Sequence, residues 1–180
     1  MSARKPGLPT DTFSAVEARI AITSRRSPNY PAQHATLIRL TRHVTKRSQD
    51  LSNLALKPYG LNMGAYNLLI ALYGTEDNRL SASELADATS EKRTNVTRIC
   101  DELVAKSLIE RVPGVSDRRS VVVSLTKAGH KLIDTLMPDM QRLLHQVYSN
   151  LNTAEMKQLA ALLRKQLVAL DQYGAAGTGS

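Results

Sequence analysis

Apolar residues recur every three or four positions over most of the chain, and this spacing predicts a protein built mainly of α-helices. Two breaks, SPNYP at 27–31 and KPYG at 57–60, end the first helices, because proline cannot continue the helical hydrogen-bond ladder. A last helix begins after Asn152, where Glu155 three residues further on completes a capping pattern. We therefore expect five longer helices, at residues 12–25, 32–57, 62–73, 127–150 and 152–173.

The middle of the chain carries two further helices close together. Ser81 and Glu84 form a capping box that starts the first of them, and Ser90 is a candidate N-cap for the second, EKRTNVTRICDELVAK. At 100° per residue, the second helix gathers its apolar residues on one face and turns Thr94, Arg98 and Asp101 to the opposite face, with Thr97 beside them. A short helix, a tight turn and a longer helix with a polar outer face form the helix-turn-helix layout.

Two strand candidates follow, LIERV at 108–112 and SVVVSL at 120–125. The segment PGVSDRR between them supplies a Pro-Gly turn and three charged residues, so we expect a hairpin with a charged tip. A helix-turn-helix followed directly by a basic hairpin is a winged helix. The predicted fold is therefore mostly α with a small β wing, in which the long helices outside the winged helix form an intertwined dimerisation region.

The charge of the chain bears on its function. Lys and Arg number 24 against 16 Asp and Glu, a net charge of +8 with a pI near 9.8. Most of the surplus lies in residues 1–47 and 92–131. Such a balance favours a polyanionic partner, although ribosomal, membrane-surface or merely soluble proteins also show it. No apolar run approaches the ~20 residues that span a bilayer, and no signal peptide is evident, so we expect a cytoplasmic protein without a membrane partner.

The longer, second helix of this pair is the candidate DNA reader. A recognition helix fits the major groove of B-DNA, where Arg98 can bond bidentately to guanine and Thr94 and Thr97 can reach thymine methyls or phosphates. Three residues of the first turns, Lys92, Arg93 and Asn95, lie where a helix N-terminus attracts phosphate. The alternative is an ordinary solvated helix face. In the hairpin, Arg118 and Arg119 suit a narrow minor groove, and Asp117 requires a salt-bridge partner because it would otherwise repel phosphate.

The segments SELADATSEKRTNVTRICDELVAKSLIER and DRRSVVVSLTKAGH resemble the MarR family of bacterial transcription regulators. The family signature corresponds to Asp117, Arg118 and Arg119, followed by Leu-Thr-x-x-Gly, here Leu125, Thr126 and Gly129. The stretches YPAQHATLIRL, RTNVTRICDEL, LHQVYSNL and LLRKQLVALDQ resemble its EmrR/MprA branch, whose members repress multidrug efflux operons. The resemblance covers about residues 10–173. It implies an obligate homodimer formed by the first and last helices, an operator of double-stranded DNA, and a scaffolding salt bridge from Asp117 to Arg119 or a nearby arginine.

The resemblance also implies a ligand, because members of this branch bind aromatic anions such as salicylate between the dimerisation helices and the winged helix. An apolar cleft with one or two cationic donors suits a small aromatic carboxylate. Residues of the right types are Tyr30, His34, Arg39, Arg42, Met63 and Tyr66. The alternative, of equal weight, is that the two arginines face solvent or bind phosphate.

No enzyme, cofactor or metal site is predicted. The four histidines, His34, His43, His130 and His145, lack metal-ligand spacing with one another, with the cysteine or with carboxylates. The single cysteine, Cys100, is either a redox sensor or, since it lies on the apolar face of its helix, an inert core residue.

We divide the chain into a flexible tail at 1–10, N-terminal helices for dimerisation and the ligand cleft at 11–60, a winged helix-turn-helix at 61–126, C-terminal dimerisation helices at 127–173 and a second flexible tail at 174–180. The function expected is a ligand-responsive repressor of a multidrug efflux operon, released from a pseudo-palindromic operator by phenolic or aromatic anions. The alternatives are a family regulator of aromatic catabolism or virulence genes and a ligand-free architectural DNA-binding protein.

Overall fold

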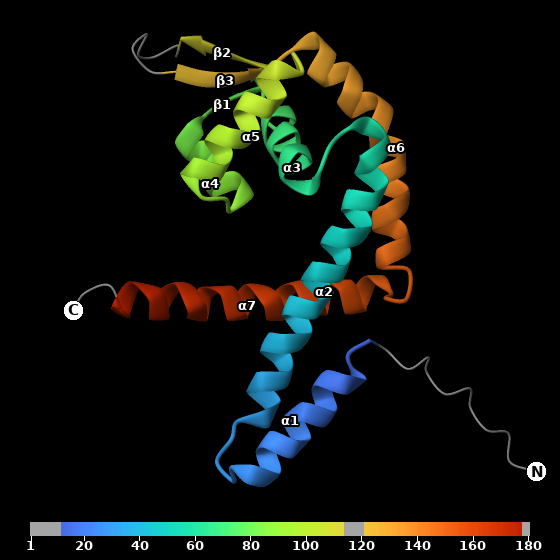
Figure 1. Ribbon diagram of the computed structural model, residues 1–180, viewed down its shortest axis with the longest axis vertical. Coiled ribbons are helices and arrows are strands. Elements are labelled where there is room, and N and C mark those ends of the chain that lie inside the picture. The colour runs from blue at the N-terminus through green and yellow to red at the C-terminus, as the bar shows by residue number, and fades with distance from the viewer. Residues whose placement is uncertain (1–11, 114–120, 178–180) are drawn as a thin grey trace, which may run out of the picture. The chain divides into compact units, whose positions relative to one another are not determined.

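The computed structural model describes residues 12–113 and 121–177 of the chain (Figure 1). Among these residues it is mostly helical with one small sheet, which confirms the predicted fold class. The chain divides into two compact units, Met1–Leu68 and Leu69–Ser180, and each is described by itself. The division falls inside one helix, Met63–Tyr73, and the predicted domain boundaries stay predictions.

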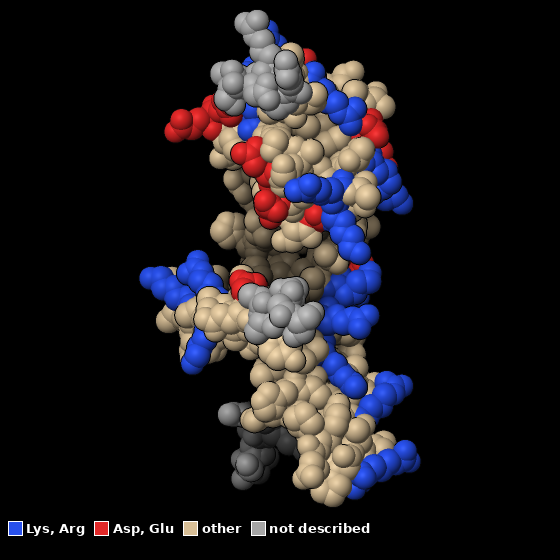
Figure 2. All heavy atoms as spheres, turned by 90° about the vertical axis from the view of Figure 1, so that its left-hand side faces the viewer, with Lys and Arg blue, Asp and Glu red and all other residues tan. Residues whose placement is uncertain are grey.

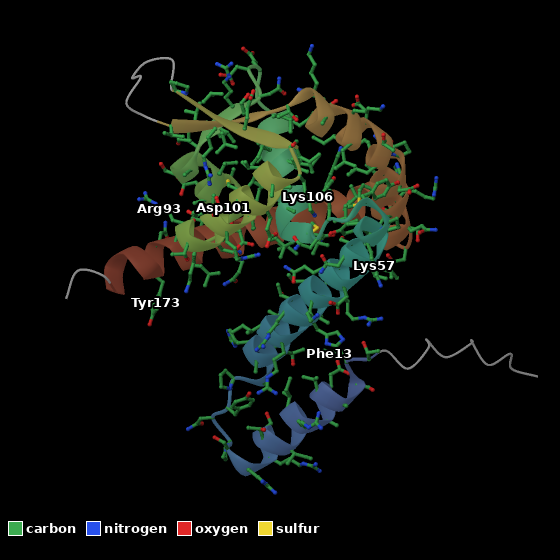
Figure 3. All side chains as sticks on the ribbon, turned by 45° about the horizontal axis from the view of Figure 1, so that its top comes forward. Phe13, Lys57, Arg93, Asp101, Lys106 and Tyr173 are labelled. Atoms are coloured by element: carbon green, nitrogen blue, oxygen red, sulfur yellow. The ribbon has the colours of Figure 1, made fainter. Side chains whose placement is uncertain are left out.

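The first unit is a helical hairpin joined to the start of a third helix. Helix α1 spans Ser14–Arg26, α2 spans Ala32–Leu56 and α3 starts at Met63. The Phe13 ring, 3% exposed and labelled in Figure 3, meets the edge of the His43 ring with centroids 5.7 Å apart. The Thr12 hydroxyl lies 2.7 Å from Nε2 of His43. These contacts hold the start of α1 against the middle of α2.

The connection from α2 to α3 follows from its sequence. A 3-10 turn, Lys57–Tyr59, holds the proline that ends α2, and Gly60 adopts the left-handed φ of 65° that turns the chain. Two asparagine side chains then cap α3, because Oδ1 of Asn53 accepts from the Met63 N–H at 2.7 Å and Oδ1 of Asn62 from the Ala65 N–H at 2.9 Å.

The second unit contains a three-stranded antiparallel sheet in the order β1-β3-β2, with β1 at Arg79–Ser81, β2 at Ile109–Pro113 and β3 at Val121–Leu125. The expected hairpin is β2–β3, and its last pair is Pro113 with Val121. The sequence analysis missed β1, since three residues leave no periodicity to detect. Its pairing with β3, Leu80 opposite Val123, defines the strand.

Helices α4, Ala82–Thr89, and α5, Arg93–Ala105, pack on each other and reach the sheet (Figure 1). The capping box is confirmed, with Glu84 N–H donating to Oγ of Ser81 at 3.3 Å and Ser81 N–H donating to Oε2 of Glu84 at 2.7 Å. The N-cap expected at Ser90 is wrong. Ser90 ends α4 in the left-handed region at φ 56°, and Lys92 precedes the first residue of α5.

Helix α6, Lys127–Val147, starts against the backbone that enters β2. The Thr126 hydroxyl donates toward the carbonyl oxygens of Ser107 and Leu108, 2.8 and 3.0 Å away, and accepts from the Gly129 N–H at 3.0 Å. A Cβ on Gly129 would lie 2.2 Å from the Leu108 carbonyl oxygen, so only glycine allows this close approach. The helix runs through Pro138 and ends three residues before the expected end at 150.

Helix α7 spans Thr153–Gly177 and is capped as expected. Oδ1 of Asn152 accepts from the Glu155 N–H at 3.0 Å, and Oε2 of Glu155 accepts from the Asn152 N–H at 2.8 Å. The expected helix end at Gly174 is wrong, because α7 continues for three more residues. A glycine weakens a helix by about 1 kcal/mol but does not by itself end one. No helix of the described residues is long and apolar enough to cross a membrane.

Candidate nucleic-acid interface

Helix α5 presents one apolar and one polar face, as its sequence predicts. Four residues of the apolar face are at most 2% exposed: Val96, Ile99, Cys100 and Leu103. The polar residues proposed as DNA contacts are exposed, except for Asn95, which is half-buried; they are Lys92, Arg93, Thr94, Thr97 and Arg98. Figure 3 labels Arg93 and Asp101 on this helix. The helix is thus anchored by its apolar face and offers cations and hydroxyls to a partner.

Four side chains of α5 and the residues just before it form a continuous polar chain. Nδ2 of Asn95 donates to Oε2 of Glu91 at 2.7 Å. Both Nε and Nη2 of Arg98 donate to Oδ1 of Asn95, at 3.2 and 2.9 Å. Nη1 of Arg98 is ion-paired with Oε1 of Glu102. The candidate base reader Arg98 is therefore held on both sides by neighbours on its own helix.

An ion pair connects α5 with the hairpin. Nη2 of Arg111, on β2, lies 2.5 Å from Oδ1 of Asp101. The hydrogen bond to this carboxylate raises the pKa of the Arg111 guanidinium, which is charged at physiological pH even without this pair. Asp101 faces outward as expected, with its side chain 60% exposed, and it also binds the hairpin.

The hairpin tip, with Asp117, Arg118 and Arg119, lies outside the described residues. The structure describes both strands that lead to it, β2 up to Pro113 and β3 from Val121. The DNA-binding roles of the three tip residues stay predictions.

Cys100 is 2% exposed on the inner face of α5, and burial raises the pKa of its thiol. A thiol held in its protonated form is a poor nucleophile. This favours the interpretation as an inert core residue over redox sensing.

The six candidate ligand residues all belong to the first unit. Tyr30 precedes α2 and is half-buried, while His34, Arg39 and Arg42 are exposed on α2. Met63 and Tyr66 are half-buried on α3, and burial raises the pKa of the Tyr66 hydroxyl. In Figure 2 basic side chains follow one edge of the α1–α2 hairpin, consistent with the exposure of its arginines and lysine, at Arg19, Arg25, Arg26, Arg39, Arg42, Lys46 and Arg47.

A cavity of about 220 Å³ lies elsewhere, in the second unit, and is lined by residues at the α6–α7 turn and along α7, namely Tyr148, Met156, Leu159, Ala160 and Leu163. The ligand-binding roles of the six candidate residues stay predictions. Among the described residues no cluster of three or more histidine, cysteine or carboxylate side chains is suited to hold a metal.

Two long helices expose stripes of large apolar side chains. On α7 these are between 40% and 58% exposed, and they are Met156, Leu159, Leu162, Leu163, Leu167, Val168 and Leu170. On α2 they are between 39% and 72% exposed, and they are Leu37, Ile38, Leu40, Val44, Leu51 and Leu54. Several exposed large apolar side chains on one helix favour a protein interface.

Comparison with known proteins agrees with a nucleic-acid interface. A family model described as transcriptional regulator SarA/Rot matches residues 50–136. The transcriptional repressor MprA of Escherichia coli is 35% identical over 161 residues, which cover 89% of this chain and 92% of MprA. These relatives are named regulators of transcription and not enzymes, as the sequence analysis predicts.

Two solved structures are similar over most of their length. One is a cysteine-to-serine mutant of Escherichia coli MarR in complex with operator DNA, with a TM-score of 0.67, 26% identity, and coverage of 88% of this chain and 99% of that chain. The other is BpsR of Bordetella bronchiseptica, whose DNA binding is regulated by 6-hydroxynicotinic acid. Its TM-score is 0.65 at 25% identity, covering 71% of this chain and 90% of BpsR.

Proposed function

Because this chain belongs to the MarR family of transcriptional regulators, in the branch of the repressor MprA, we propose that it acts as a homodimer that binds a pseudo-palindromic operator and leaves it when a small aromatic anion binds. Repression of transcription and DNA binding are the shared properties of these relatives. Our proposal adds three points to these shared properties: the homodimer, the ligand and the target, a multidrug efflux operon. Each has its own support.

The observation that carries the proposal is the exposed polar face of α5. Thr94, Thr97 and Arg98 occupy the part of the helix that faces base edges when such a helix enters a major groove. Lys92 and Arg93, at the N-terminus of α5, contact phosphate. In the wing, Arg118 and Arg119 enter the minor groove, and Asp117 holds the hairpin in shape.

The apolar stripe of α7 supports the homodimer. Its seven large side chains are at least 40% exposed, and a second copy of the chain covers them in our proposal. A two-fold axis also fits the DNA, because a pseudo-palindrome presents its half-sites about 34 Å apart, one helical turn of the duplex.

The ligand proposed is an aromatic carboxylate such as salicylate. Support comes from BpsR, whose regulator 6-hydroxynicotinic acid is an aromatic acid of the same size class. In this chain Arg39 and Arg42 supply positive charge from α2, His34 and Tyr30 lie near its start, and the half-buried Met63 and Tyr66 supply apolar surface from α3.

The efflux target follows from the relation to the MprA branch. A regulator of aromatic catabolism is the second candidate, since the regulator of BpsR is itself an aromatic acid. Transcript levels in a strain that lacks this gene separate the two, because the derepressed genes encode either a transporter or catabolic enzymes.

The DNA and ligand proposals are tested with the full-length protein. The preferred duplex is first selected from a randomised double-stranded library, and electrophoretic shifts then compare it with random DNA at increasing salt. Salicylate releases the selected duplex, while neutral salicylamide at the same concentration does not. Light scattering gives twice the 19.7 kDa chain mass if the homodimer is correct. Binding that shows no sequence preference would instead indicate the architectural protein, because non-specific binding is almost wholly electrostatic.

A further inference from the structure

We infer that Asn95 and Glu102 are positioning residues that hold the Arg98 guanidinium ready for a base, so that sequence preference depends on two side chains that do not touch that base. This inference rests on the proposed function, in which α5 reads an operator. It changes the role of Asn95, which the sequence analysis places against phosphate.

The Arg98 guanidinium uses only part of its hydrogen-bonding capacity within the helix. It has five N–H groups, and three are used within the helix, by Nε and Nη2 on Oδ1 of Asn95 and by Nη1 on Oε1 of Glu102. Two N–H groups are left, one on each terminal nitrogen. Two donors are what O6 and N7 of guanine accept in the major groove. The contacts of Asn95 and Glu102 thus leave Arg98 the donors that a guanine needs.

Glu91 determines which end of the Asn95 amide meets Arg98. Its Oε2 accepts from Nδ2 of Asn95 at 2.7 Å, which directs the amide oxygen to the guanidinium. Asn95, Arg98 and Glu102 are spaced by three and four residues within α5 and so lie along one face of the helix, while Glu91 lies two residues before its start. The half-buried Asn95 connects the two acidic residues through Arg98.

Without a positioning role, Glu102 would be unfavourable for DNA binding. Its carboxylate, 45% exposed next to the proposed base reader, repels the phosphates of any DNA that α5 approaches. Ordering the long Arg98 side chain before binding reduces the entropy that is lost on binding. The ion pair therefore weakens attraction to all DNA and favours the duplex with the correct base. A residue that acted only through its charge would change the affinity for the preferred duplex and for random DNA equally.

The experiment measures sequence preference and non-specific affinity separately. The duplex selected by the full-length wild-type protein is compared with duplexes changed at one base pair at a time, and with random DNA. The variants are Arg98→Ala, Asn95→Ala, Glu102→Ala and Glu102→Gln. The control is Glu110→Ala, which removes the same charge from an exposed position on β2.

Arg98→Ala identifies the base pair that depends on Arg98. At that base pair we expect Glu102→Ala and Asn95→Ala to reduce discrimination about tenfold, within the range of one bidentate base contact. Glu102→Ala also binds random DNA more tightly. Glu102→Gln keeps most of the discrimination because its amide oxygen still accepts from Nη1. Glu110→Ala strengthens binding to selected and random DNA alike, and all variants keep the wild-type melting temperature within a few degrees.

Wild-type discrimination at that base pair in Asn95→Ala and Glu102→Ala would overturn the inference and leave the proposed function intact. A uniform loss of affinity for selected and random DNA in Asn95→Ala would also overturn the inference, since that is the behaviour of a phosphate contact. An Arg98→Ala protein with unchanged sequence preference would overturn it as well. A wild-type protein that prefers no sequence would overturn the proposed function together with the inference.

Discussion

Asp101 and Arg111 join the exposed helix α5 to the first strand of the hairpin through an ion pair of 2.5 Å. They are ten residues apart in the chain, and the turn between α5 and β2 brings them together. The pair thereby holds α5, which carries proposed DNA contacts, against strand β2.

The first prediction concerns this pair. Both side chains are substantially exposed, at 60% and 42%, so Arg111→Ala should cost less than about 1 kcal/mol of folding stability. Affinity for the selected duplex should nevertheless fall several-fold, because the hairpin loses its contact with α5. A stability loss of this size does not by itself explain such a fall, since the variant stays folded. Fluorescence anisotropy and thermal unfolding measure the two effects. The exchanged pair Asp101→Arg with Arg111→Asp should recover part of the affinity, and no recovery would mean that Arg111 itself contacts DNA.

Gly129 provides a second test. Gly129→Ala places a methyl group 2.2 Å from the Leu108 carbonyl oxygen, and the backbone cannot yield without breaking the cap at Thr126. We expect a loss of about 1–3 kcal/mol in denaturant unfolding, as for other overpacked sites. The matched control is Gly174→Ala on α7, where the added Cβ meets no atom within 4 Å and the better helix former should stabilise slightly. Equal effects of the two substitutions would contradict the close approach of α6 to β2.

Ser90 tests the turn between α4 and α5. Its φ of 56° is unfavourable for a residue with a Cβ, and Ser90→Gly should stabilise the protein by about 0.5–1 kcal/mol after the greater entropy of the unfolded glycine is subtracted. Urea unfolding gives the difference. Ala88→Gly introduces the same residue inside the helix α4 and should destabilise by a similar amount. A destabilised Ser90→Gly protein would show that the serine hydroxyl matters more than the backbone strain.

Cys100 should be unreactive in the native protein. Because burial raises its pKa, less thiolate is present at pH 7–8 than for a free cysteine, and access is blocked as well. The expected result is a slow reaction with a disulfide reagent that becomes fast on denaturation, and DNA binding that survives mild peroxide. Rapid native labelling, with loss of DNA binding, would restore the redox interpretation.

Arg39 tests the ligand proposal. Arg39→Ala should bind the selected duplex like the wild type but require roughly tenfold more salicylate for release, the size of a typical coupling between two sites. Arg47→Ala, another exposed arginine of α2, is the control for the change in charge. A mutant released at the wild-type concentration would remove Arg39 from the site, and one that fails to bind DNA would assign it to the phosphate backbone.

The sequence predicts those elements that depend on local signals. Capping at Ser81 and Asn152 and the apolar spacing of α5 are properties of neighbouring residues, and they agree with the structure. Strand β1 depends on its partner β3 and leaves no local signal, and the left-handed φ of 56° at Ser90 was missed because glycine is the usual residue in such a turn. The contacts of Asn95 with Arg98 and of Asp101 with Arg111 were not predicted either, because they emerge only from side-chain geometry.

The anchoring of α6 by Thr126 and Gly129 has a mechanical consequence. The bonds to Ser107 and Leu108 join the first turn of α6 to the backbone that enters β2, so we expect the helix and the hairpin to move together as one arm. With 21 residues and a rise of about 1.5 Å per residue, the arm is about 30 Å long. A tilt of about 5° then moves its far end by nearly 3 Å, and conversely a shift of about 3 Å at the far end reorients the hairpin by the same angle. The joint where α6 meets α7, at Tyr148–Asn152, is therefore the point from which a small displacement has the greatest leverage over the wing.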